Sequence, residues 1–189
     1  MLVFWPRPSE DQVALNVDGS SYGNHGPAGY GGLIRNRQGL WISGFSGHIN
    51  HADSLEAELL AIMHGLMLVW DYGYPNVSCI SDCKNALRLI DLEPIFQPPK
   101  YIAIINAIQE LISRDWNVSF VHTYREANQC ADFMAKLGTK SMNNCFEIFT
   151  DIFLEPPTDL TSLLESDAEG TGYSRTNWTK ARFCLGSCF

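Results

Sequence analysis

Two aspartates in this 189-residue chain directly follow segments that have the pattern of β-strands. The alternating residues 13–17 lead to Asp18, and the apolar residues 77–81 lead to Asp82. Two carboxylates at the ends of adjacent parallel strands repel each other unless a cation lies between them, so the pair indicates a metal site. The alternative is local, because Gly19 can turn the chain after Asp18 and each aspartate can cap the segment that follows it.

Four further residues are candidates for chemistry at this site. Glu56 and Glu58 lie at opposite edges of the apolar stripe of one predicted helix, so helical spacing does not choose between them, and either can be a solvated flanking charge. Asp132 lies near the apolar face of the last predicted helix and can equally pair with a basic residue. His122 ends a strand and can transfer protons near neutral pH, or serve as a hydrogen-bonded structural histidine.

The elements that must position these residues follow in a regular order. Alternating and apolar runs predict strands, and apolar stripes at helical spacing predict helices. The glycine-rich residues 23–29 predict a loop. The expected strands are residues 13–18, 30–35, 40–48, 77–81 and 117–121, and the expected helices are residues 54–72, 83–91, 100–114 and 126–137.

This order predicts an α/β fold with a five-stranded mixed sheet flanked by helices. The first three strands form an antiparallel meander, and the last two are parallel because helices connect them. Asp18 and Asp82 then lie at the carboxyl ends of neighbouring parallel strands, where sites in such sheets are found.

The length of the chain is sufficient for one sizeable core, so one main domain is expected over residues 11–140. Residues 1–10 are expected to form an N-terminal arm, and residues 141–166 a C-terminal extension that packs on the domain. Residues 167–189 are predicted to be a mobile tail.

The charge and the cysteines restrict the class of protein. Thirteen basic against 21 acidic residues argue against a protein whose affinity comes mainly from neutralising many phosphates. The apolar residues 1–5 end at Pro6, which is too short for a signal peptide or a membrane span. Six cysteines without a Cys-x-x-Cys pair are typical of thiols in a reducing compartment. We therefore expect an intracellular protein of the nucleus or cytoplasm that is neither secreted nor bound to a membrane.

The same residues occur in motifs that resemble those of the type 1 ribonuclease H superfamily, in the same order. The resemblance is greatest to the ribonuclease H-like domain of plant LINE-type retrotransposons and their stand-alone derivatives. It covers residues 13–138 well and residues 153–157 more loosely. The motifs are Leu-Asn-Val-Asp-Gly at 15–19, Gly-Asn-His-Gly-Pro-Ala-Gly at 23–29, Glu-Ala-Glu-Leu-Leu-Ala at 56–61, Ser-Asp at 81–82 and Arg-Glu-Ala-Asn-Gln-Cys-Ala-Asp at 125–132.

The resemblance implies an endonuclease that hydrolyses the RNA strand of RNA:DNA hybrids with two divalent cations. It selects Glu58 over Glu56, and it implies Mg²⁺, or Mn²⁺ as a substitute, held by Asp18, Glu58, Asp82 and Asp132. His122 would assist proton transfer and product release. A monomer is expected. The implied nucleic-acid contacts are Gly19, Ser20, Asn24 and Asn128.

Two departures from the family pattern keep other functions open. Residues 54–56 replace side chains that help many relatives read RNA 2′-hydroxyls, and residues 93–99 lack the positive charge of the basic helix that some relatives carry there. Binding is therefore expected to be weak and salt-sensitive. The main alternative is a catalytically weak or inactive, retrotransposon-derived nucleic-acid-binding module. A third possibility is a nuclease of the same fold that acts on DNA.

Overall fold

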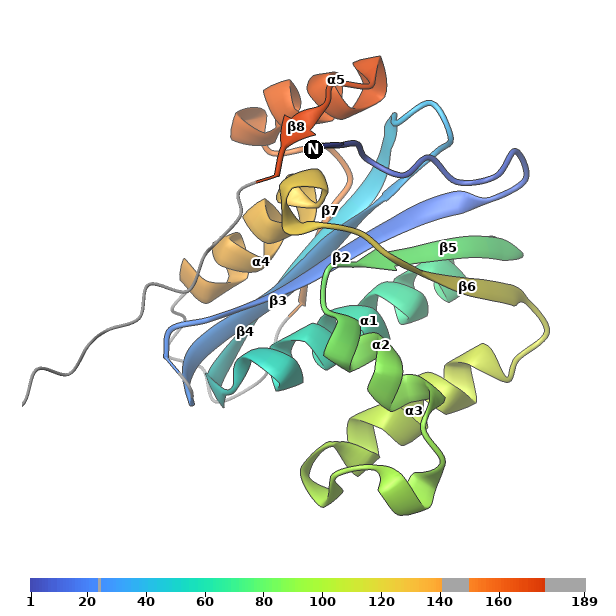
Figure 1. Ribbon diagram of the computed structural model, residues 1–189, viewed down its shortest axis with the longest axis vertical. Coiled ribbons are helices and arrows are strands. Elements are labelled where there is room, and N and C mark those ends of the chain that lie inside the picture. Colours follow the sequence, from blue (N-terminus) through green and yellow to red (C-terminus); the bar gives the residue numbers. More distant parts are fainter. Residues whose placement is uncertain (24, 141–149, 176–189) are drawn as a thin grey trace, which may run out of the picture.

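The computed structural model describes residues 1–23, 25–140 and 150–175. A six-stranded mixed sheet forms its centre, in the strand order β6-β5-β2-β3-β4-β7 (Figure 1). The pairs β2–β3 and β3–β4 are antiparallel, and β5 is parallel to both β2 and β6. The strands are β2 (Val13–Ser21), β3 (Gly26–Arg35), β4 (Trp41–Ala52), β5 (Asn76–Ser81), β6 (Asn117–His122) and β7 (Thr150–Phe153).

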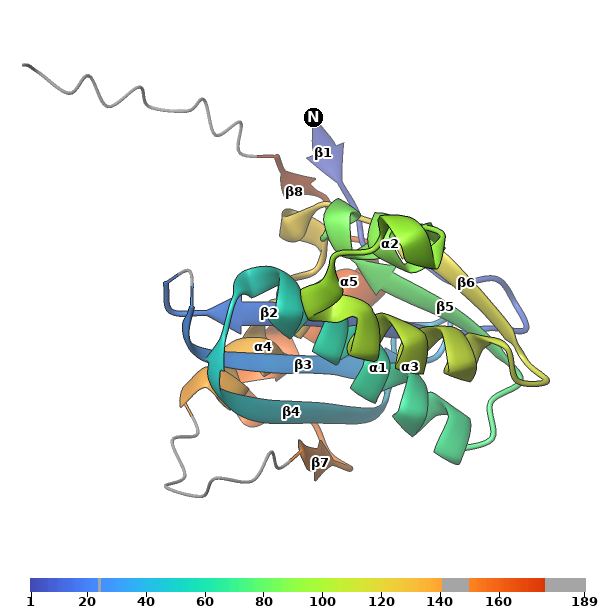
Figure 2. The same cartoon turned by 90° about the horizontal axis from the view of Figure 1, so that it is seen from below.

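Helices cover both faces of this sheet (Figures 1 and 2). Helices α1, α2 and α3 pack on one face, and α4 and α5 lie on the other. The predicted α/β class and the meander with two parallel strands are therefore confirmed. The helices are α1 (Ser54–Asp71), α2 (Lys84–Asp91), α3 (Ile102–Ile112), α4 (Gln129–Lys140) and α5 (Thr161–Glu169).

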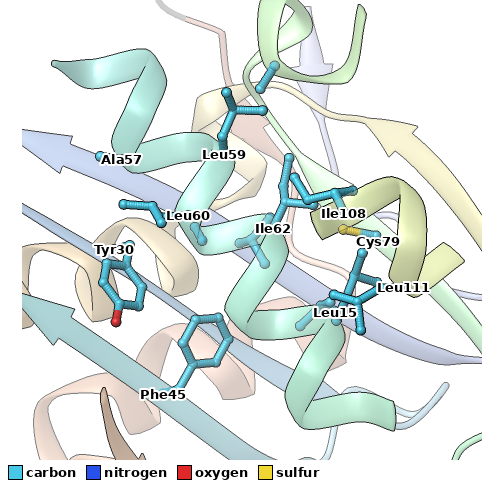
Figure 3. Close-up of a cluster of buried hydrophobic side chains, with 14 of the residues drawn as sticks. Leu15, Tyr30, Phe45, Ala57, Leu59, Leu60, Ile62, Cys79, Ile108 and Leu111 are labelled. Carbon is cyan, nitrogen blue, oxygen red and sulfur yellow. The ribbon is translucent and has the colours of Figure 1, made fainter. Parts of the chain in front are cut away.

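The larger part of the core lies between the sheet and α1. Leu15, Phe45 and Ile62 are fully buried there, and Ile108 of α3 closes the far side of α1 (Figure 3). Burial of each such side chain contributes about 1.5–3 kcal/mol to stability, so this face fixes the position of α1 on the strands. Asp53 begins the helix, because its Oδ1 accepts a hydrogen bond from the backbone N of Glu56 at 2.8 Å.

The glycine-rich segment is partly strand, contrary to the predicted loop, since β3 begins at Gly26. A Cβ atom at Gly29 would lie 2.3 Å from the backbone N of Thr139, and one at Gly31 would lie 2.6 Å from the carbonyl carbon of Met134. These glycines therefore let α4 lie directly on β3, a tertiary requirement that local turn propensity does not reveal.

The prediction of five strands was short by one, because β7 pairs antiparallel with the edge of β4 over Gly44–Gly47. No local pattern marks this pairing, since the two strands are distant in the sequence. The C-terminal extension expected over residues 141–166 includes β7, but its residues 141–149 lie outside the described residues.

The predicted mobile tail begins too early. Residues 167–169 belong to α5, and β8 (Tyr173–Ser174) pairs antiparallel with β1 (Leu2–Val3) of the expected N-terminal arm. Asp167 is buried because it pairs with Arg35 of β3, a partner that the sequence of the tail cannot show. The rest of the predicted tail, residues 176–189, lies outside the described residues.

Among the described residues, no helix is both long and apolar enough to span a membrane.

Candidate active site

Three acidic side chains from three different elements meet at one end of the sheet. Asp18 lies on β2, Glu58 in the second turn of α1, and Asp82 directly after β5. One carboxylate oxygen from each lies within 4.8 Å of the other two. Asp18 and Glu58 are 6% and 8% exposed, so two of the three carboxylates are nearly removed from water.

The parallel pairing of β2 and β5 brings the two aspartates together. Asn16 pairs with Ile80, and Asp18 and Asp82 each follow two residues later on their own strand. The sequence-based expectation that these strands are parallel neighbours is therefore confirmed by the register.

Gly19 brings the glutamate to this pair. A Cβ atom at this position would lie 2.4 Å from the backbone N of Glu58 and 2.9 Å from the Cβ of Ala57. The expectation that Gly19 turns the chain is wrong, because β2 continues to Ser21. Its lack of a side chain instead lets the start of α1 approach the strand beside Asp18.

We expect Gly19→Ala to destabilise the protein by about 1–3 kcal/mol, because the added methyl group must displace the backbone of α1. The displacement also moves Glu58, so cation affinity is expected to fall. Urea unfolding and Mn²⁺ binding would measure the two effects, with Gly23→Ala as a control in open space, where the cost is the positive φ of 87° alone. An alanine variant with unchanged stability and Mn²⁺ affinity would show that α1 does not depend on this close approach.

Glu58, rather than Glu56, is the helix residue in the carboxylate cluster. The Oε2 of Glu56 lies 3.0 Å from the Nζ of Lys100, on the side of the helix that faces the start of α3. The structure thus makes the choice that helical spacing left open, and it agrees with the choice implied by the family resemblance.

The electrostatics of the cluster favour a proton or a cation. Burial, and then the charges of the neighbouring carboxylates, raise the pKa of Asp18 well above its usual value. Burial, and then the charge of Asp82, raise the pKa of Glu58 to about 8. Burial also raises the pKa of Asp82. The Oε2 of Glu58 is buried and has no hydrogen-bond partner within the described part of the chain. Hard divalent cations prefer carboxylate oxygens, so the residues present fit such an ion.

Asp132, the fourth predicted ligand, lies close to the cluster but outside this group of three. Its Oδ1 accepts a hydrogen bond from Arg125 at 3.1 Å, and its Oδ2 lies 2.5 Å from the Nζ of Lys136. Its charge still raises the pKa of Asp18. Asp132 therefore has the basic partners that were the alternative to a role as metal ligand. It also lies close enough to the proposed ligands to affect Asp18.

Arg125 is a site residue to which the sequence analysis assigned no role. Its guanidinium lowers the pKa of Asp18, Glu58 and Asp82 and so reduces the repulsion within the cluster. The sequence feature that could have indicated this role is its position in the motif at residues 125–132, seven residues before Asp132.

His122 lies next to the cluster, at the end of β6. Its Nε2 is 3.2 Å from the backbone oxygen of Asp82, and burial lowers the pKa of its imidazole. The histidine therefore contacts the backbone of a cluster residue, and its role in proton transfer stays a prediction.

The predicted nucleic-acid contacts differ in their placement. Asn128 is 2% exposed, and its side chain bonds to Asn16 and to the carbonyl oxygen of Val17. Both ends of its amide are therefore engaged inside the protein, and its contact with a substrate stays a prediction. Ser20 is partly buried on β2, and Asn24 lies outside the described residues.

Comparison with known proteins gives one family and one curated relative for this chain. A model of the reverse transcriptase-like family matches residues 16–138. The Arabidopsis thaliana protein named "Putative ribonuclease H protein At1g65750" is 31% identical over 170 residues, which are 90% of this chain. The chain spans about a quarter (26%) of the length of that relative.

Solved structures show the same fold at lower sequence identity. The N-terminal ribonuclease H domain of Rv2228c from Mycobacterium tuberculosis superposes with a TM-score of 0.63 at 22% identity, covering 69% of this chain and 94% of that chain. Ribonuclease H1 from the archaeon Halobacterium salinarum gives 0.61 at 22% identity, covering 67% and 96%. LC11-RNase H1 in complex with an RNA/DNA hybrid gives 0.60 at 24% identity, covering 67% and 96%.

Proposed function

The chain belongs to the reverse transcriptase-like family and has a ribonuclease H fold, and from this membership we propose that it is a metal-dependent endonuclease. The proposed reaction is hydrolysis of the RNA strand of RNA:DNA hybrids by a two-metal mechanism. A structural relative has been solved with such a hybrid, and the plant relative bears the name of a ribonuclease H. We further propose that the protein acts as an intracellular monomer.

The observation that carries this proposal is the cluster of Asp18, Glu58 and Asp82. Three carboxylates within 4.8 Å of one another, with raised pKa values, repel each other less when a cation binds. The Oε2 of Glu58 has no hydrogen-bond partner among the residues that the structure describes, so it can accept such a cation. Bound divalent cations would supply the positive charge that activates water and stabilises the leaving oxygen of a phosphodiester. Mg²⁺ is the expected ion, and Mn²⁺ the expected substitute.

The side chains around this cluster have separate tasks in the proposed reaction. Asp132 would complete the ligand set, with the cation in place of its ion pairs with Arg125 and Lys136. Arg125 then presents a guanidinium free to pair with a phosphate oxygen. His122 lies beside Asp82 with an imidazole whose lowered pKa keeps it neutral near pH 7, so it can accept a proton there.

Cleavage of a labelled RNA:DNA hybrid tests this function. The parent protein is expected to cut the RNA strand with Mg²⁺ or Mn²⁺, while Asp82→Asn, which keeps the shape of the side chain, is expected to leave the hybrid intact. Duplex RNA and duplex DNA serve as competing substrates. Faster cleavage of duplex DNA would identify a DNA nuclease of the same fold instead.

A second candidate function is a binding module that associates with nucleic acid without turnover. It is favoured by the pairing of Asp132 with two basic side chains and by the pairing of Glu56 with Lys100, near the positions that in many relatives read RNA hydroxyls. Hybrid binding by well-folded protein, without products at any Mg²⁺ or Mn²⁺ concentration and unchanged by Asp82→Asn, would establish this function and exclude the first.

A further inference from the structure

A line of buried polar side chains connects the C-terminal extension to the carboxylate site. It runs from Asp167 of α5 through Arg35 of β3 and Asn16 of β2 to Asn128, directly before α4. Each of these four residues is at most 4% exposed. Figure 1 shows α5, β8 and the N-terminus on the side of the sheet that carries α4.

Arg35 and Asp167 form the far end of the line. The NH1 of Arg35 donates to the Oδ2 of Asp167 at 2.7 Å, and the indole of Trp5 lies over the guanidinium at 4.0 Å. Tyr173 of β8 donates its hydroxyl to the Oδ1 of Asp167 at 2.8 Å. A buried guanidinium needs a compensating negative charge, and the C-terminal extension supplies it with the carboxylate of Asp167.

The side-chain amide of Asn16 has one defined orientation, because its Oδ1 faces two groups that can only donate hydrogen bonds. These are the NH2 of Arg35 at 2.8 Å and the Nε1 of Trp5 at 3.0 Å. Its Nδ2 must therefore face the other way, where it donates to the Oδ1 of Asn128 at 3.0 Å. The amide of Asn128 is fixed in turn, and its Nδ2 donates to the backbone oxygen of Val17 at 2.9 Å.

Asn128 joins the two parts of the site that carry Asp18 and Asp132. Val17, whose oxygen it binds, directly precedes Asp18. Its own backbone oxygen accepts from the backbone N of Ala131 and of Asp132, both at 3.1 Å, and so forms the first turn of α4. The line therefore ends at the backbone of Asp132 and at that of Val17, the residue before Asp18.

We propose that Asp167 is a positioning residue for this site: through Arg35, Asn16 and Asn128, and directly through the thiol of Cys130, it holds the first turn of α4, and with it Asp132, against β2 beside Asp18. This inference rests on the proposed function for its catalytic consequence, but its structural claim concerns the chain alone. The C-terminal extension is on this account part of the working nuclease rather than an appendage.

Amide hydrogen exchange by NMR tests the structural claim directly. Asp167→Asn is expected to accelerate exchange of the Ala131 and Asp132 amides by about tenfold or more, relative to amides of α1 and α3 in the same variant. Ser46→Ala is the matched control, since Ser46 donates to the backbone oxygen of Met134 and holds α4 outside the line. A uniform acceleration over all helices, or none at the two amides, would overturn the proposal.

The replacement of Arg35 by Met together with Asp167 by Leu separates positioning from stability. An apolar pair of similar size leaves no uncompensated buried charge, so this double variant is expected to fold. It also removes the donor from Arg35 to Asn16, and we expect the same two amides to exchange faster than in the parent. Parent-like exchange in the folded double variant would contradict the proposal.

Electron paramagnetic resonance of bound Mn²⁺ measures how the loss of Asp167 affects cation binding at the carboxylate site. Asp167→Asn is expected to lower the Mn²⁺ affinity several-fold and to lower kcat for the hybrid more than it raises KM, because Asp167 touches neither ion nor substrate. If the parent itself binds no Mn²⁺ and cleaves no hybrid, the proposed function fails. The exchange of the two amides still decides the inference in that case.

Discussion

Asp18→Asn is expected to abolish hybrid cleavage, with a loss of about 10³-fold or more in kcat/KM. Outer-shell partners of a metal site already cost about 10–100-fold when removed, and Asp18 is one of the three clustered carboxylates, within 4.8 Å of Glu58 and Asp82. The amide keeps the shape of the side chain but removes the charge that attracts the cation. Single-turnover cleavage of a labelled hybrid under saturating Mg²⁺ would measure the loss.

The same substitution is expected to stabilise the metal-free protein by about 1 kcal/mol or more, because it relieves repulsion among three carboxylates of which two are buried. Thermal unfolding in EDTA would show a higher Tm for Asp18→Asn than for the parent. The stabilisation that Mg²⁺ gives the parent should disappear in the variant. Glu56→Gln, outside the cluster, is the control and should retain both cleavage and the Mg²⁺ effect. Parent-like cleavage by Asp18→Asn would remove Asp18 from the mechanism.

Glu58→Gln is expected to change how stability depends on pH. The pKa of Glu58 is raised to about 8 in the folded protein from an ordinary value of 4.5, so the folded state holds a proton that the unfolded state has lost. Its stabilising contribution is complete below the unfolded value and is lost as the pH rises through about 8. In the absence of divalent cations, the free energy of unfolding of the parent should therefore fall as the pH rises in this window.

Urea unfolding in EDTA between about pH 6.5 and about pH 8.5 would measure this slope. The lower limit avoids His64, whose burial lowers its pKa to about 4 and gives a slope of the opposite sign below its ordinary value. The fall in stability should be smaller in Glu58→Gln than in the parent, by on the order of 1–2 kcal/mol over this range. Saturating Mg²⁺ should flatten the slope of the parent as well. Parallel slopes for the two proteins would show that Glu58 is ionised throughout.

Much of the fold could be predicted because its signals are local. Alternating strands, apolar helical stripes and turn residues indicate each central element from its own residues, and the connecting helices make the later strands parallel. The missed elements, β1, β7 and β8, are short strands stabilised by partners far away in the sequence. Their own residues carry little of the information, because the pairing surface belongs to another segment.

The residues of the candidate site also differ in whether the sequence alone could indicate their roles. Asp18 and Asp82 could be proposed from strand patterns alone, and the resemblance to ribonuclease H selected Glu58 where helical spacing could not. Asn128 was assigned to the substrate by resemblance, whereas the structure uses its amide to join α4 to β2. An asparagine amide can bond to a substrate or to another part of the protein, so the residue type alone does not show which of the two it binds.

The sequence by itself thus determined the class of fold through residue type and periodicity, and the resemblance of its motifs to a known family indicated the acidic residues of the candidate site. Only the tertiary structure decided that Gly19 admits α1 to the strand, that Arg125 and Lys136 hold Asp132, and that Asp167 reaches the site through buried amides. The reason is physical: a close approach, an ion pair and a hydrogen-bond orientation each depend on two groups at once. Their meeting is set by the packing of the whole chain.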